Sequence, residues 1–146
     1  ITQTDSVTRK VSSNPVDWST DKGWFVDFNP GNLSPGERVN LDPQLVLGTL
    51  VVTTNVPNAS ACTIGGESWQ YQFNYATGSY ILTSPQQVLG SKLANALTVG
   101  NVIVRLPSGQ LKGISTDAAG IKRTAGINVG GSAASAKRVS WRELTQ

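Results

Sequence analysis

Histidine and methionine are absent from this chain of 146 residues, and cysteine occurs once, as Cys62. Without histidine the chain cannot hold a Ser-His-Asp triad, a Cys-His dyad or the usual histidine-containing zinc sites. A single cysteine excludes an internal disulfide bond. Cys62 is interpreted as a small buried residue, the alternative being a bridge to a part of the protein outside this sequence. Since reading frames start with methionine, we expect the sequence to be a piece of a longer protein.

Charged residues are also scarce, at 14% of the chain against about a quarter in typical globular proteins. Low charge combined with abundant Thr and Val favours extended β structure rather than disorder. Residues 1–100 hold five basic and seven acidic side chains, whereas residues 101–146 hold seven and two. These later basic side chains are interpreted as solvent-facing positions, the alternative being a surface for an acidic partner; they are Arg105, Lys112, Lys122, Arg123, Lys137, Arg138 and Arg142. Nucleic-acid binding needs stacking aromatics on such a face, so no nucleic-acid partner is expected.

Long apolar runs are missing too. The longest, Leu45 to Val52, is interrupted by Gly48 and Thr49, whereas a membrane-spanning helix needs about 20 predominantly apolar residues. We therefore expect no membrane span.

The strand patterns are the clearest positive signal. Alternation predicts strands at Gly23–Phe28 and at Ser68–Tyr75, the second with Trp69, Tyr71, Phe73 and Tyr75 on one face. Two apolar runs, 44–47 and 49–54, meet at Gly48 and predict a hairpin with a tight turn. The aromatic side chains are interpreted as core packing, the alternative being a stacking platform for a sugar or peptide.

Weaker patterns fill the rest of the chain. The first twenty residues predict one short strand at most, 91–97 at most a turn or two of helix, and 121–136 a loop. Residues 101–106 and 110–115 flank a Pro-Ser-Gly turn and predict a second hairpin. A closing strand at 138–144 is expected to bury Trp141 and to expose Arg142.

Together these patterns predict an all-β, antiparallel fold with β-propeller-like blades and no substantial helix. We expect residues 1–146 to form a single all-β region, a fragment of a larger β-propeller domain, with approximate blade units at 22–82 and 84–144. Because propellers need about four to eight blades, the chain would be a partial propeller or an open β-sheet fragment.

No constellation of reactive residues stands out, so we expect no catalytic, cofactor-binding or metal-binding residues. Paired carboxylates are the remaining route to hydrolytic chemistry, yet carboxylates at strand ends are mostly solvated or salt-bridged. Contact surfaces are expected on the loops 55–63 and 126–136, because binding residues concentrate on loops. The carboxylate candidates are Asp17, Asp27, Glu37, Asp42 and Glu67.

An ordered series of short motifs runs through most of the chain. In order, these are NPVDW at 14–18, KGW at 22–24, GER at 36–38, a Pro-led apolar run from 43, Cys62 before Gly65-Gly66, a Trp strand from 68, ATG at 76–78 and SWREL at 140–144. This series resembles the C-terminal β-propeller region of the PilC/PilY family, the tip-associated adhesins and assembly factors of bacterial type IV pili.

The resemblance implies a non-catalytic domain that contributes to pilus assembly, to opposing retraction and to adhesion. It implies minor pilins and host-cell or surface receptors as partners, and a location outside the cell at the pilus tip after export through the periplasm and outer membrane. The family's Asp/Asn-rich calcium loop has no counterpart after Gly78, so calcium binding is not carried over. Two alternatives remain, a fragment of an exported quinone-type propeller enzyme and a carbohydrate-binding β module.

Overall fold

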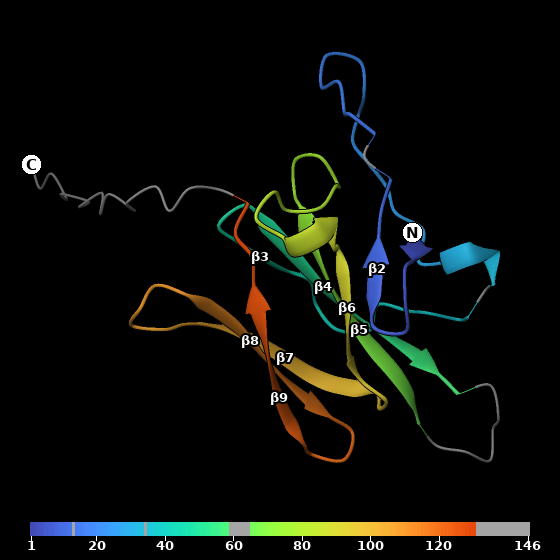
Figure 1. The fold of residues 1–146 in the computed structure, drawn as a ribbon, viewed down its shortest axis with the longest axis vertical. Coiled ribbons are helices and arrows are strands. Elements are labelled where there is room, and N and C mark those ends of the chain that lie inside the picture. The colour runs from blue at the N-terminus through green and yellow to red at the C-terminus, as the bar shows by residue number, and fades with distance from the viewer. Residues whose placement is uncertain (13, 34, 59–64, 131–146) are drawn as a thin grey trace, which may run out of the picture.

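The computed structural model describes residues 1–12, 14–33, 35–58 and 65–130. Within these ranges the regular structure consists of nine β-strands and two short 3-10 helices, with no α-helix (Figure 1). The elements in chain order are β1 (Thr2–Gln3), β2 (Thr8–Lys10), a 3-10 helix (Pro30–Asn32), β3 (Gln44–Val46), β4 (Thr49–Pro57), β5 (Gly66–Asn74), a 3-10 helix (Pro85–Gln87), β6 (Gly90–Ala94), β7 (Thr98–Arg105), β8 (Leu111–Asp117) and β9 (Lys122–Ile127).

The strands form two open antiparallel sheets. The larger has six strands in the order β1-β2-β6-β5-β4-β3, and the smaller has the order β7-β8-β9. Every pairing is antiparallel, so the predicted all-β, antiparallel class is confirmed. In the larger sheet β2 pairs with β6, with Arg9 opposite Gly90, although β3, β4 and β5 lie between them in the sequence.

The hairpin predicted at Gly48 is confirmed. Leu47 and Gly48 connect β3 to β4 with φ angles of 44° and 80°, and Val46 pairs with Thr49 across the turn. Two successive residues with positive φ are typical of the type I′ turn, whose twist matches that of the flanking strands. A glycine at the second position relieves the steric cost of that conformation.

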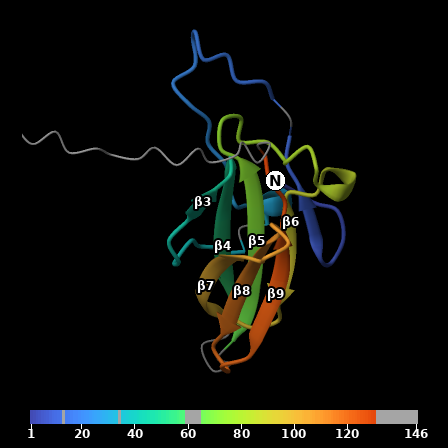
Figure 2. The same ribbon diagram turned by 90° about the vertical axis from the view of Figure 1, so that its left-hand side faces the viewer.

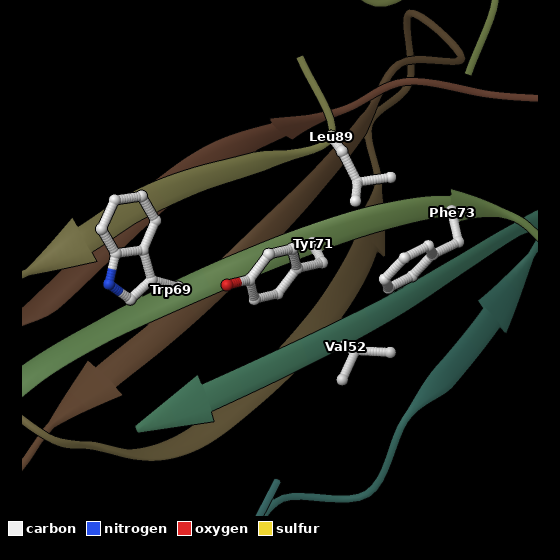
Figure 3. Packing of buried hydrophobic residues seen from close by; sticks show 5 residues of the cluster. All are labelled: Val52, Trp69, Tyr71, Phe73 and Leu89. Atoms are coloured by element: carbon white, nitrogen blue, oxygen red, sulfur yellow. The ribbon is translucent and has the colours of Figure 1, made fainter. Parts of the chain in front are cut away.

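The central strands are covered on both faces. On one face, Trp69, Tyr71 and Phe73 of β5 are completely buried and pack with Val52 and Leu89 (Figure 3). The segment after β2 covers these rings, because Trp24, Val26 and Phe28 pack against them. The ring centroid of Phe28 lies 4.9 Å from that of Tyr71, and the centroid of Trp24 lies 5.4 Å from that of Phe73. Burial on both faces explains why residues 51–54 in the middle of β4 are a continuous β-branched run rather than an alternating one.

On the other face, the small sheet lies across the large one (Figure 2). Its apolar contact is small, with Val51, Leu111 and Ile127 buried and Val46, Ile103 and Val129 partly buried against them. Hydrogen bonds supplement it: the Gln72 side chain donates to the Gly126 carbonyl and accepts from the Asn128 N–H, each at 2.8 Å. Gln72, which alternates with the aromatic residues of β5, therefore binds the second sheet, and the Ser68 hydroxyl accepts a hydrogen bond from the Thr98 hydroxyl of β7.

Aromatic core packing is confirmed for three of the four predicted side chains, all with 0% exposure. Tyr75 lies beyond the end of β5 and is 55% exposed, so its assignment to the buried face was wrong. The strand predicted at Gly23–Phe28 is also absent. Its alternation nevertheless reports burial, because Trp24, Val26 and Phe28 are partly buried while Phe25 is 94% exposed.

Three weak segments form strands that the patterns did not predict. The N-terminal region contains two short strands instead of at most one, the stretch 91–97 contributes to β6 instead of a helical turn, and Lys122–Ile127 is β9 instead of a loop. Each is defined by its pairing partner, since β6 pairs with β5 and β9 pairs with β8. Non-local pairing overrides weak local preference in strands.

The expected blade units stay a prediction, and the pairing of the described strands is as follows. The two sheets have six and three strands, and β6, from the second unit, pairs with β5 of the first. Membership in a larger propeller stays a prediction. The expectations for Cys62, Trp141 and Arg142 fall outside the described residues.

Candidate functional site

Two of the five carboxylate candidates, Glu37 and Glu67, lie close together, and the other three are dispersed. Glu37 and Glu67 lie on either side of the Arg9 guanidinium, with Glu37 Oε2 at 2.5 Å from Nη1 and Glu67 Oε1 at 4.0 Å from Nη2. Asp17 accepts hydrogen bonds from the Ser19 N–H and hydroxyl within its own turn. Asp27 and Asp42 are exposed.

Arg9 is the centre of this cluster. It is on β2 and only 2% exposed, and its guanidinium carbon lies 3.7 Å from the centroid of the Trp69 ring. Such a position over an aromatic face is favourable for a desolvated cation. Arg9 Nη1 also donates to the Tyr71 hydroxyl. Only two residues of β2 pair with β6. The Arg9 side chain, which reaches into the core, therefore also holds β2 in place.

Glu37 completes the buried part of the cluster. Its side chain has no exposed surface, and its Oε1 accepts hydrogen bonds from the Tyr71 hydroxyl at 2.7 Å and the Thr54 hydroxyl at 2.5 Å. Burial raises the pKa of Tyr71 well above its usual range, and the adjacent Glu37 carboxylate raises it further. The phenol is therefore held in its protonated form and acts as a hydrogen-bond donor.

Glu67 forms the outer edge of the cluster. It is ion-paired with Lys92, and its Oε1 accepts a hydrogen bond from the Trp69 indole N–H at 2.9 Å. Partial burial alone would raise the pKa of Glu67. The hydrogen bonds from Lys92 and Trp69, with the charges of Lys92 and Arg9, outweigh burial and lower the pKa below its ordinary value.

We call this arrangement of Arg9, Glu37, Thr54, Glu67 and Tyr71 the clamp. The Glu37 carboxylate accepts hydrogen bonds from Arg9 Nη1, Thr54 and Tyr71, so these polar groups point at each other instead of into an open cleft. The buried Arg9 Nε has no hydrogen-bond partner among the described residues. The clamp joins four parts of the chain, namely β2, the segment before β3, β4 and β5. Sequence reasoning missed Arg9, and no local pattern marks it.

The loops expected to carry contacts begin later than predicted. Residues 55–57 belong to β4 and residues 126–127 to β9, while 59–64 and 131–136 fall outside the described residues. The Asn55 side chain is buried and bonds to the backbone of Thr98 through its Oδ1 and Nδ2. It therefore holds the two sheets together instead of presenting a surface.

The described residues contain no cluster of three or more His, Cys, Asp or Glu side chains that could hold a metal ion. In the same part of the chain, no helix has the length and apolar character required to cross a membrane.

Comparison with known proteins finds partial relatives. Over 77 residues, which is 51% of this chain and 5% of the relative, the chain is 35% identical to a type IV pilus biogenesis factor PilY1 homolog of Xylella fastidiosa. Over 77 residues it is 29% identical to the type IV pilus biogenesis factor PilY1 of Pseudomonas aeruginosa strains PAO1 and PAK, covering 48% of this chain and 6% of each relative. No protein-family profile matches the chain, and no solved structure does.

These matches support a relationship of about half of the chain to PilY1-like proteins and suggest a part in type IV pilus biogenesis. The names of the relatives also suggest a surface or exported protein. The chain spans only a small part of the length of these relatives, since the match covers 5% of the Xylella fastidiosa protein and 6% of the Pseudomonas aeruginosa proteins.

Proposed function

We propose that this chain is a non-catalytic region of a type IV pilus biogenesis protein that contributes to pilus assembly, opposes pilus retraction and supports adhesion to cells or surfaces. The observation that carries the proposal is the 77-residue similarity to proteins named as pilus biogenesis factors. The proposed location is the cell surface at the pilus tip, and the proposed partners are minor pilins and surface receptors.

The geometry of the clamp supports a structural role. Its carboxylates are engaged by Arg9, Lys92, Tyr71 and Thr54, and the raised pKa of Tyr71 makes it a poor proton donor near neutral pH. A region built in this way holds a rigid sheet surface in a fixed position. Such a surface suits docking between subunits better than turnover of a substrate.

The test is an in-frame deletion of residues 1–146 from the encoding gene in its own bacterium, complemented by the intact gene. Surface pili are quantified after shearing, adhesion is counted on epithelial cells and on glass, and immunoblotting verifies export of the shortened protein. We expect fewer surface pili and weaker adhesion. Undiminished piliation and adhesion with normal export would refute the proposal.

A second strain, in which retraction is blocked, separates two parts of the proposal. If the region opposes retraction, blocking retraction restores pili to the deletion strain. If the region is needed for assembly itself, pili stay scarce in both backgrounds.

A further inference from the structure

Strand β7 is an edge of the small sheet, and its outward backbone groups face the end of the large sheet. The Asn101 carbonyl accepts a hydrogen bond from the Gln44 side chain of β3 at 2.9 Å, so it points away from β8. Leu106 N–H, by contrast, donates to Gln110 within the β7–β8 hairpin. Along an antiparallel strand, the N–H and C=O groups of successive residues point alternately to one side and to the other. The backbone groups of Ile103 and Arg105 therefore point away from β8, as the Asn101 carbonyl does.

A groove runs between this edge and β3. Its volume is about 400 Å³, and it is lined by Leu45, Val46, Leu47, Ile103, Leu111, Gln44 and Arg105. The floor continues into the apolar contact between the sheets, because Val46 and Ile103 pack against the buried Leu111. Leu45 is 61% exposed and Leu47 is 39% exposed. An apolar groove beside an unpaired strand edge is the geometry that extended peptides use when they add to a sheet.

The charge around the groove is positive. Among the residues that the structure describes, Arg105 is the one charged residue that lines it. The small sheet also carries Lys112, Lys122 and Arg123, while its single acidic residue, Asp117, is buried and paired with Arg123. An acidic segment is therefore attracted and a basic one repelled. Residues 131–146 carry three basic side chains and one acidic side chain, so charge disfavours this segment as the occupant. It equally disfavours the small sheet of a second copy.

We propose that the groove between β3 and β7 binds an extended segment of another protein, added antiparallel to the β7 edge. Every second side chain of such a segment points into the groove. An apolar residue of the segment therefore faces Ile103, and an acidic residue two positions from it faces Arg105. The segment covers the exposed leucines and pairs with the outward backbone groups of Ile103 and Arg105, for which the described part of the chain provides no partner strand. This inference rests on the edge, the groove and the charge, and it is independent of the role in pilus biogenesis.

The test uses the full chain and fluorescein-labelled nine-residue peptides of alternating Thr and Val. One peptide has a Glu at a Val position, its partner has a Lys there, and a third repeats the Glu peptide with N-methylated backbone amides. Fluorescence anisotropy measures binding. We expect the Glu peptide to bind about fivefold more tightly than the Lys peptide, in line with the strength of exposed charge pairs. N-methylation should abolish binding, because it removes the backbone donors.

Two variants and an exchange measurement locate the site. Arg105→Glu should reverse the preference, whereas Lys122→Glu, which makes the same charge change on β9, should leave it unaltered. Hydrogen exchange followed by NMR should show slower exchange of the Ile103 and Arg105 amides when the Glu peptide is added.

Four results would overturn the proposal. The first is that the peptides bind equally or not at all, and the second is that protection arises at another edge. The third is that the Ile103 and Arg105 amides are already protected in the free chain and lose protection when residues 131–146 are removed, which would identify the chain's own segment as occupant. The fourth is that this protection grows with protein concentration, which would identify a second copy.

Discussion

Replacing Glu37 with glutamine tests the clamp most directly. The substitution preserves shape but removes the charge that compensates Arg9, whose exposure is 2%. Breaking a buried ion pair by removing one partner costs about 3–5 kcal/mol, because an uncompensated charge is left in the interior. A domain of this size has about 5–15 kcal/mol of stability in total. We therefore expect Glu37→Gln to remove a large share of the free energy of unfolding and to lower Tm by about 10 °C.

The matched control is Glu67→Gln, which makes the same chemical change beside the same guanidinium. Glu67 lies farther from Arg9, at 4.0 Å, and its side chain is 31% exposed, so its loss should cost at most about 1 kcal/mol. Urea denaturation followed by tryptophan fluorescence measures both variants, since Trp69 stacks on Arg9. Equal losses for the two variants would show that burial of the Arg9–Glu37 pair does not determine its contribution.

A double-mutant cycle then isolates the pair. Arg9→Met combined with Glu37→Gln removes both charges, so no ion is left uncompensated. The double variant should be more stable than the sum of the single losses implies, with a coupling of about 1–3 kcal/mol. Strict additivity would mean that the two side chains act independently despite their 2.5 Å contact.

Three further predictions follow from packing and charge. The pKa of Glu67 is lowered in the folded state. Its contribution to stability should therefore be complete above the unfolded pKa, near 4.5, and should be lost as pH falls through the folded pKa. Between pH 6 and 3, the urea denaturation midpoint should fall less for Glu67→Gln than for the unsubstituted chain. Gly90→Ala should cost about 1–3 kcal/mol, since its new Cβ would lie 2.6 Å from an aromatic ring carbon, whereas Gly126→Ala, with nothing within 4 Å, should cost less than about 1 kcal/mol by thermal denaturation. Trp24→Ala should destabilise the fold by about 2–3 kcal/mol, because the ring packs on the core and its N–H bonds to a backbone carbonyl, while Phe25→Ala should change Tm by less than about 2 °C.

The strong periodic segments could be predicted from the sequence. The β3–β4 hairpin follows from two apolar runs around Gly48, and the burial of Trp69, Tyr71 and Phe73 follows from their alternation. The segment Gly23–Phe28 shows where this reasoning has a limit. Its alternation correctly indicates which side chains are buried, but burial against a sheet does not require that the segment itself pair as a strand.

The elements that were missed depend on contacts made far along the chain. Strand β9 has a mixed, weakly apolar sequence, and it is a strand because β8 offers it a complete register of partners. The clamp could not be predicted for the same reason, since Arg9, Glu37 and Tyr71 lie in separate segments and each has an ordinary local sequence. Only the folded sheet brings the three together.

The pairing of β2 with β6 has a consequence for how the chain folds. The meander β3-β4-β5 and the meander β7-β8-β9 join neighbours in sequence and can form early, whereas β2 must wait for β6. Contacts between distant segments close late and slow the overall rate. Substitutions at Arg9 should therefore accelerate unfolding more than they retard refolding. During synthesis, the aromatic face of β5 emerges before β6 can recruit β2, and a transiently exposed face of this kind is where a nascent chain is most prone to aggregate.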